Sequence, residues 1–321
     1  MRFFVTKCAR LGLLARDAEV LRWNHCSSLS SIGARSYLIK RWFAPKSSWI
    51  KMHGTSSRPL FALNGRTIAV TGGAEGLGRC MSEALANAGA DIIVTSRTLR
   101  RATRAAAEIS GTFGGGALGV RLDQCDPASV ARFARTAWAW HGRIDVLLNN
   151  AGGHAGSGRT DLFRRSWQAI DATITTNLTG VLYCCQQVGV LMARQGFGKI
   201  INVASISGLI GRSRAIYHRN KVREPAVDYA AAKAGIIGLT RDLAACLAPY
   251  HIQVNTLSPG GFDRGRAPKS FVVDFGRLTP LGRMGRPVDE LNGAIVFLAS
   301  SASDYVTGHN LVVDGGFSAI K

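Results

Sequence analysis

The fold is set by residues 67–90, which read Thr-Ile-Ala-Val-Thr-Gly-Gly-Ala-Glu-Gly-Leu-Gly-Arg-Cys-Met-Ser-Glu-Ala-Leu-Ala-Asn-Ala-Gly-Ala. A short β-branched run (67–70) leads into a glycine-rich turn (71–78), and an Ala- and Leu-rich stretch of helical character (79–90) follows. A strand, a tight glycine turn and a helix in this order form the first part of a βαβ unit. The stretch therefore predicts an α/β domain.

The same alternation continues to the C-terminus. Helical stretches separate short apolar runs, which are Thr67–Val70, Ile92–Ser96, Leu118–Leu122, Ile144–Asn149, Lys199–Ala204, Ile252–Leu257 and Asn310–Val313. Near-continuous apolar strands are typical of a parallel sheet that helices cover on both faces. We predict a single α/β domain with a Rossmann-type, doubly wound, parallel seven-stranded sheet.

Composition excludes several classes of function. The 321 residues are 46% hydrophobic and 19% charged, and no apolar run approaches the roughly 18 residues of a membrane span. The formal charge is +20, but no basic face interleaved with aromatic residues predicts nucleic-acid binding. The seven cysteines lack a CxxC pair and the histidines lack metal-ligand spacing. We therefore expect free thiols, no metal, no membrane and no nucleic acid.

Residues 1–58 differ from the rest and are predicted to be a basic N-terminal extension outside the fold, with the folded domain at 59–321. Residues 1–51 carry ten Lys and Arg against two acids. One interpretation is a mitochondrial transit peptide, because such leaders are rich in Arg and Ser and poor in acids. The other is a translation start at Met52. We expect a cytoplasmic protein, or one of the mitochondrial matrix if residues 1–51 are a genuine transit peptide.

The glycine-rich turn has the character of a phosphate-binding loop. Glycines let the backbone approach a pyrophosphate, and the following helix N-terminus supplies amides and a positive dipole end. The spacing is not the common G-x-G-x-x-G, and such a turn can also serve packing alone. Its place at the first turn of a βαβ unit favours dinucleotide binding.

The end of the second strand distinguishes NADP from NAD. Residues 94–97 read Val-Thr-Ser-Arg, without the acid that would accept the ribose 2′-hydroxyl of NAD. Arg97 could bind a 2′-phosphate through charge-assisted hydrogen bonds, whereas Glu75 in the glycine turn would repel it. We predict NADP(H) in preference to NAD(H).

Several motifs in the same chain order resemble those of the short-chain dehydrogenase/reductase family. They are Thr71-Gly72-x-x-x-Gly76-x-Gly78, Asn149-Asn150-Ala151-Gly152, Asn177, Ser205, Tyr229-Ala-Ala-Ala-Lys233, Ser258-Pro259-Gly260 and Val312-Val313-Asp314-Gly315-Gly316. The resemblance covers about residue 60 to the C-terminus. Residues 279–285 are most similar to gluconate 5-dehydrogenase-like and 3-oxoacyl carrier-protein reductase-like members.

The resemblance implies the strand order 3-2-1-4-5-6-7 and a set of site residues. The catalytic group would be Asn177, Ser205, Tyr229 and Lys233. The cofactor-binding residues would be Thr71, Gly72, Gly76, Leu77, Gly78, Ser96, Arg97, Asp123, Asn150, Ala151, Gly152, Tyr229, Lys233, Pro259 and Gly260. It also implies a homodimer or homotetramer through the helices around Asn177 and Tyr229.

The residue chemistry agrees with these roles. Tyr229 and Lys233 are four apart on a predicted helix and share one face. A nearby ammonium favours phenolate, so it would move the pKa of Tyr229 from about 10 toward the working range. Tyr229 would exchange the proton of the substrate oxygen, Ser205 would hydrogen-bond that oxygen, and Lys233 would hold the nicotinamide ribose. By resemblance, Asn177 would link Lys233 to solvent through water.

The chain departs from the family pattern between Ser205 and Tyr229. Family members usually have a dozen or so residues there, whereas the separation here is 24. The additional segment, 215–225, is basic, and we hypothesise that Arg219 and Arg223 bind an anionic substrate; the alternative is a solvated surface loop. Arg264 stands where many members place a threonine that holds the nicotinamide amide.

The sequence thus predicts an NADP-dependent oxidoreductase that interconverts a secondary alcohol and a ketone of a small molecule. One hypothesis is that the substrate is an anion such as a sugar acid, a hydroxy acid or an acyl thioester. A 3-oxoacyl thioester reductase is the alternative among enzymes, and a non-catalytic, cofactor-sensing scaffold is the alternative of another class. A scaffold has no need to keep Ser205, Tyr229 and Lys233 together.

Overall fold

The structure is a computed structural model that describes residues 59–153, 159–286 and 289–320. The extension predicted over residues 1–58 lies outside the described residues, as does the question of where translation starts.

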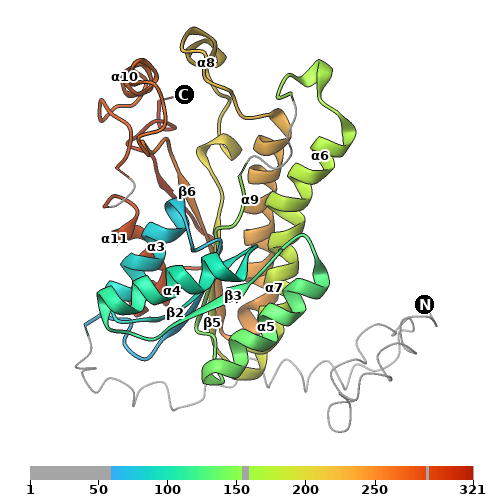
Figure 1. The fold of residues 1–321 in the computed structure, drawn as a ribbon, viewed down its shortest axis with the longest axis vertical. Helices are drawn as coiled ribbons and strands as arrows, with labels where there is room; N and C mark the ends of the chain where they lie inside the picture. The colour runs from blue at the N-terminus through green and yellow to red at the C-terminus, as the bar shows by residue number, and fades with distance from the viewer. Residues whose placement is uncertain (1–58, 154–158, 287–288, 321) are drawn as a thin grey trace, which may run out of the picture. The chain divides into compact units, whose positions relative to one another are not determined.

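The sheet in the described residues has seven strands, all of them parallel, in the order β3-β2-β1-β4-β5-β6-β7 (Figure 1). The strands are β1 (Thr67–Thr71), β2 (Asp91–Ser96), β3 (Ala117–Arg121), β4 (Val146–Asn149), β5 (Gly198–Val203), β6 (Ile252–Pro259) and β7 (Asn310–Val313). This confirms the predicted fold class and strand order.

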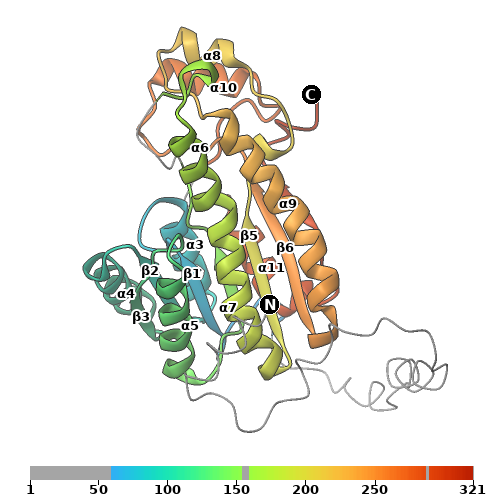
Figure 2. The ribbon, with the colours of Figure 1, turned by 90° about the vertical axis from the view of Figure 1, so that its right-hand side faces the viewer.

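Helices cover both faces of the sheet, and each face has its own apolar cluster. On one face lie α3 (Gly76–Asn87), α4 (Leu99–Phe113) and α11 (Asn292–Ala299), and on the other lie α5 (Pro127–His141), α7 (Gly180–Gln195) and α9 (Val227–Leu247) (Figures 1 and 2). Two buried faces explain why the strand sequences are apolar without alternation.

Element boundaries differ from the sequence expectation at two places near the predicted site. α3 begins at Gly76 rather than Arg79, because the Arg79 amide already donates to the Glu75 carbonyl over 3.2 Å. The last glycines of the turn, Gly76 and Gly78, therefore belong to the first turn of α3. β6 continues to Pro259 rather than ending at Leu257, because Pro259 still pairs with Val313 of β7.

The additional segment before Tyr229 forms a short helix, α8 (Arg214–Arg219), that packs on α10 (Lys269–Arg277). The rings of Tyr217 and Phe271 lie 5.2 Å apart between these helices. Both helices stand beyond the carboxyl ends of β5 and β6 (Figure 2). Since ligands of open parallel sheets bind beyond this edge, the segment borders the predicted site.

None of the helices in the described ranges combines the length and apolar character needed to cross a bilayer. The five described cysteines are free thiols, as expected.

Two glycines test the packing that holds β2 and β3 against α4. A Cβ on Gly119 of β3 would lie 2.4 Å from the Thr103 amide nitrogen in α4, so Gly119→Ala should lower the free energy of unfolding by about 2–3 kcal/mol. A Cβ on Gly111, inside α4, would meet nothing within 4 Å, so Gly111→Ala should raise it by about 0.5 kcal/mol. Urea denaturation measures both, and a Gly119→Ala protein as stable as the wild type would contradict this packing.

Candidate active site

The glycine turn is fastened to the end of β4. The Thr71 hydroxyl accepts hydrogen bonds from the amides of Asn150 (3.0 Å) and Ala151 (2.9 Å). The Asn150 side-chain amide donates back to the carbonyls of Thr71 (3.0 Å) and Gly72 (3.2 Å). The structure therefore brings the two predicted cofactor-binding segments together at the carboxyl edge of the sheet.

The turn has room for backbone only. Gly72 and Gly76 have φ values of +62° and +60°, which favour glycine, and a Cβ on Gly78 would lie 2.2 Å from the Gly72 carbonyl oxygen. No side chain caps the N-terminus of α3, where Glu75 is the capping position. Amides of an uncapped first turn are donors for an anion. The turn, with Leu77 in this first helical turn, therefore fits the pyrophosphate of a dinucleotide.

The predicted ribose end of the site is exposed and basic. Ser96 ends β2 and Arg97 follows it on the surface. Arg101 lies 3.8 Å from the carboxylate of Glu75, so the acid expected to repel a 2′-phosphate has a cationic neighbour. Asp123 follows β3 and accepts a hydrogen bond from the Cys125 amide over 3.0 Å, which fixes the turn there.

The candidate catalytic group forms where α9 meets the end of β5. Lys233 is buried, and its Nζ donates a hydrogen bond to the Val203 carbonyl over 2.7 Å. The same Nζ lies 5.8 Å from the centroid of the Tyr229 ring. Tyr229 forms a side-chain hydrogen bond with Ser205, two residues beyond Val203. The structure thus brings together the three residues singled out from the sequence.

The electrostatics of Tyr229 differ from the sequence expectation. Burial raises the pKa of its phenol, and the groups that oppose this rise are the Ser205 hydrogen bond and the guanidinium groups of Arg212 and Arg264, rather than Lys233. Burial also lowers the pKa of Lys233, to about 8. Burial disfavours the charged form of Lys233. The positive charges that lower the pKa of Tyr229 are those of the two arginines.

Asn177 lies in a π-helical turn, η4 (Thr175–Thr179), between α6 (Trp167–Ile174) and α7. Such a turn re-aims a side chain within a helix. Asn177 is fully buried, and its amide accepts from the Gly153 nitrogen and donates to the Gly153 carbonyl, both over 2.8 Å. A Cβ on Gly152 would lie 2.8 Å from Asn177 Oδ1 and 3.6 Å from Lys233 Nζ, so Gly152 lies beside both.

Gln124 belongs to this group and was missed in the sequence. Its side-chain amide donates to the carbonyls of Ala151 (3.0 Å) and Thr176 (2.6 Å), and thereby joins the end of β3 to the loop after β4 and to η4. Its place just after a parallel strand was the available signal, because such ends meet at one edge.

The loop after β6 closes another side of the site. The Gly260 amide donates to the Val313 carbonyl over 2.9 Å, and a Cβ there would lie 2.7 Å from Asp314 Cα, so Pro259-Gly260 lies tightly against the end of β7. Further along, Arg264 Nη1 lies 3.3 Å from the position of a Cβ on Gly76. This arginine therefore extends over the glycine turn.

The structure does not bring Arg219 to Tyr229. Arg219 Nε pairs with Asp274 Oδ2 of α10 at 3.0 Å, and Arg223 is exposed in the segment between α8 and α9. Arg212, from the same basic region, is the arginine near the phenol.

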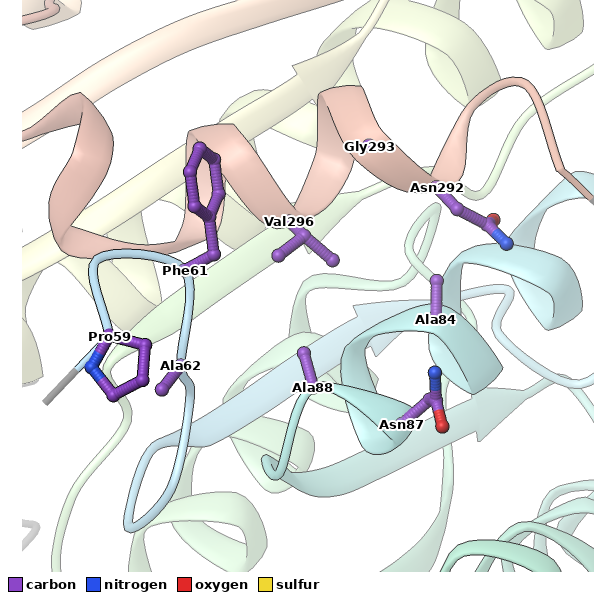
Figure 3. A pocket seen from close by; sticks show the side chains of 9 residues that line it. All are labelled: Pro59, Phe61, Ala62, Ala84, Asn87, Ala88, Asn292, Gly293 and Val296. Atoms are coloured by element: carbon purple, nitrogen blue, oxygen red, sulfur yellow. The ribbon is translucent and has the colours of Figure 1, made fainter.

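A cavity of about 510 Å³ lies elsewhere, between the segment before β1, the end of α3 and α11 (Figure 3). Its lining residues are Pro59, Phe61, Ala62, Ala84, Asn87, Ala88, Asn292, Gly293 and Val296. No acid, base or nucleophile is among them, so this cavity does not compete with the site around Tyr229. Over the residues that the structure describes, no group of His, Cys, Asp or Glu is arranged to hold a metal ion.

Comparisons with known proteins find relatives over most of the chain. A family model described as enoyl-(acyl carrier protein) reductase matches residues 72–318. The chain is 32% identical to a 3-oxoacyl-(acyl-carrier-protein) reductase of Aquifex aeolicus, over 79% of this chain and 98% of that protein. It is 34% identical to the D-threitol dehydrogenase of Mycolicibacterium smegmatis, over 80% and 95%.

Two solved structures extend the comparison. A gluconate 5-dehydrogenase from Burkholderia cenocepacia, in complex with NADP and tartrate, superimposes with a TM-score of 0.73 at 34% identity, covering 82% of this chain and 98% of that one. A short-chain type dehydrogenase/reductase from Mycobacterium marinum gives a TM-score of 0.70 at 34% identity, covering 80% and 97%.

The buried ammonium predicts a gain in stability when it is removed. Lys233 has a pKa of about 8 in the folded chain against a usual 10.5, so between these pH values the unfolded chain binds more protons. The free-energy cost of burying the Lys233 ammonium therefore lowers the stability in full below pH 8, and this cost disappears as the pH rises toward 10.5. After allowing for the lost hydrogen bond to Val203, Lys233→Met should be about 2 kcal/mol more stable than the wild type at pH 7.

Urea denaturation at pH 7 and at pH 10 measures this difference. The control is Lys269→Met, at the exposed start of α10, which should match the wild type at both pH values. A Lys233→Met protein that is less stable than the wild type at pH 7 would contradict the penalty.

Proposed function

Because the chain belongs to the short-chain dehydrogenase/reductase family and is an oxidoreductase of CH–OH groups, we propose that it interconverts a secondary alcohol and a ketone with NADP(H) through Tyr229, Ser205 and Lys233. The observation that carries this proposal is the hydrogen bond between Tyr229 and Ser205 beside the buried Lys233. When bound, the nicotinamide supplies the hydride chemistry.

Tyr229, Ser205 and Lys233 have different roles in the proposed reaction. In the reductive direction Tyr229 donates its phenolic proton to the carbonyl oxygen, and in the oxidative direction the phenolate takes the proton of the alcohol. Ser205 donates a hydrogen bond to the same oxygen and stabilises the negative charge that develops there. Lys233 holds the ribose hydroxyls of the cofactor, and the charges of Arg212 and Arg264 favour the phenolate. Asn177 keeps the loop at Gly152 and Gly153 in place beside Lys233.

The proposed preference for NADP(H) rests on charge. Arg97 is exposed beyond β2, and Arg101 offsets the acid of Glu75. Among similar proteins, the gluconate 5-dehydrogenase was solved with NADP, and a mannitol dehydrogenase of Hypocrea jecorina is described as NADP-dependent. The cofactor-binding residues predicted from the sequence, from Thr71 to Gly260, are carried into this proposal.

The substrate is proposed to be a small hydroxy or oxo compound that carries an anion. The tartrate bound to the similar gluconate 5-dehydrogenase supports this class. A 3-oxoacyl thioester reductase is the second candidate, supported by the similarity to 3-oxoacyl-(acyl-carrier-protein) reductases. A cofactor-sensing scaffold would need no hydrogen bond between Ser205 and Tyr229. The expected homo-oligomer and cytoplasmic location stay predictions.

Removing one hydroxyl tests the chemical role. Tyr229→Phe should lower kcat/KM for ketone reduction by about 10²–10⁴-fold, because the general acid is lost, while the Kd of NADPH stays within about twofold. Cofactor oxidation with a panel of ketones gives the first value and NADPH fluorescence the second. Tyr250→Phe, at an exposed tyrosine 45% accessible to solvent, is the control and should match the wild type. Full activity of Tyr229→Phe would refute the assignment.

Removing one positive charge tests the cofactor preference. Arg97→Gln should weaken NADPH binding by about 10–100-fold through the loss of charge-assisted hydrogen bonds, and should change the Kd of NADH by less than about twofold. Arg104→Gln is the matched control, because Arg104 is also exposed, on α4, but pairs with Glu108. Equal losses for the two cofactors would exclude a contact with the 2′-phosphate.

A further inference from the structure

We propose that Arg212 binds a negatively charged group of the substrate beside Tyr229, so that the enzyme prefers hydroxy and oxo acids to neutral alcohols and ketones. This inference rests on the proposed oxidoreductase function and deepens it, because it names the residue that selects the substrate class. It replaces Arg219 and Arg223 in that role.

The backbone places Arg212 between the two halves of the candidate site. Ser205 caps the N-terminus of the short helix η5 (Ile206–Gly208), and Arg212 follows within the same connection. Its Nη2 donates to the carbonyl oxygen of Ala226 over 3.2 Å. Ala226 is the N-cap residue of α9, three residues before Tyr229. The guanidinium therefore connects the serine loop to the start of the tyrosine helix.

Arg212 has no acidic partner among the ion pairs of the described residues, unlike its neighbours. Arg214 pairs with Glu224 at 2.8 Å and Arg219 with Asp274 at 3.0 Å. The Nη1 atom of Arg212 is buried without a hydrogen-bond partner in the part of the chain that the structure describes. A buried charged donor left unpaired costs several kcal/mol, and a carboxylate is the group that matches a guanidinium best.

A bound acid would reach this guanidinium only with a local shift of the α8 segment. Nη1 is out of contact with solvent in this conformation, although the residue as a whole is half-buried. Bulk water therefore does not reach the atom in this conformation, and a ligand carboxylate admitted by the shift would accept a hydrogen bond from it. The Tyr217 phenol of α8 is close enough to influence the pKa of Arg212, which places α8 near the guanidinium.

Arg264, the other arginine near the phenol, faces the cofactor rather than the substrate. Its Nη1 lies 3.3 Å from the Cβ position of Gly76 in the glycine turn. A cation over that turn lies near the expected pyrophosphate. This leaves Arg212, on the side of the serine loop, as the cation for the substrate.

The two arginines also influence the proton of Tyr229. The charged and titratable groups that face the phenol are Arg212 in the loop after β5, Tyr217 in α8, Arg264 in the loop after β6 and Lys233 in α9. Arg212 lowers the pKa of Tyr229, so its removal raises that pKa. The acid limb of the pH profile for alcohol oxidation, which follows formation of the phenolate, should then move to higher pH.

The test compares acids with polyols that have the same carbon skeleton. The pairs are tartrate with threitol and gluconate with sorbitol, each oxidised with NADP⁺. The wild type should favour the acid of a pair by tenfold or more in kcat/KM. Arg212→Gln should lose at least tenfold with acids and less than threefold with polyols, and Arg212→Lys should recover part of the loss. Arg277→Gln, an exposed arginine of α10 that pairs with Asp274, is the control and should match the wild type.

A binding measurement keeps this inference separate from the proposed function. Calorimetry of tartrate with the NADPH complex, which cannot oxidise it, should give a Kd that Arg212→Gln weakens at least tenfold. Equal losses of Arg212→Gln with acids and polyols, an unchanged pH profile, or a wild type that favours polyols would overturn the inference and leave the oxidoreductase function intact. Absence of turnover with every ketone and alcohol would overturn the proposed oxidoreductase function. The tartrate Kd would still test whether Arg212 binds an acid.

Discussion

The hydrogen bond from the Lys233 ammonium to the Val203 carbonyl joins α9, the longest helix of the described domain, to the carboxyl end of β5, an inner strand of the sheet. Val203 is the last residue of β5, Ser205 follows two residues later, and Tyr229 lies one helical turn before Lys233. One contact therefore fixes the distance between the serine and the tyrosine. Because burial lowers the pKa of this ammonium to about 8, keeping it charged at neutral pH lowers the free energy of unfolding. Such strain at a buried charge is typical of a functional site.

The pKa of Tyr229, like that of Lys233, is shifted by its surroundings. Burial alone would keep the phenol protonated well above neutral pH, and Ser205, Arg212 and Arg264 act against burial. The two arginines come from the loops after β5 and β6, which are adjacent strands, so their meeting at the phenol is a consequence of the parallel sheet. The loops after β5 and β6 thus each bring one positive charge to the phenol, Arg212 and Arg264 respectively.

The sequence was sufficient to predict the sheet and which strand ends meet at its carboxyl edge, for a physical reason. Strands buried on both faces are apolar throughout, and the ends of parallel strands meet at one edge, so a glycine turn, an asparagine and a serine at such ends are neighbours. The ion-pair partners of the long basic side chains could not be predicted from the sequence. Arg219 turns to Asp274 because α8 packs on α10, and nothing periodic in residues 206–226 predicts that contact. Gln124 was missed because a glutamine after a strand is common and its two carbonyl partners come from distant loops.

A crystal structure of the protein with NADP⁺ would examine the arrangement of Tyr229, Ser205 and Lys233 without any assumption about the substrate. The nicotinamide ring should lie beside the Tyr229 hydroxyl, with Lys233 Nζ within about 3 Å of a ribose hydroxyl and the pyrophosphate on the amides of the glycine turn. A dinucleotide bound away from these residues, or a Tyr229 side chain turned away from the nicotinamide, would contradict the assignment of the site.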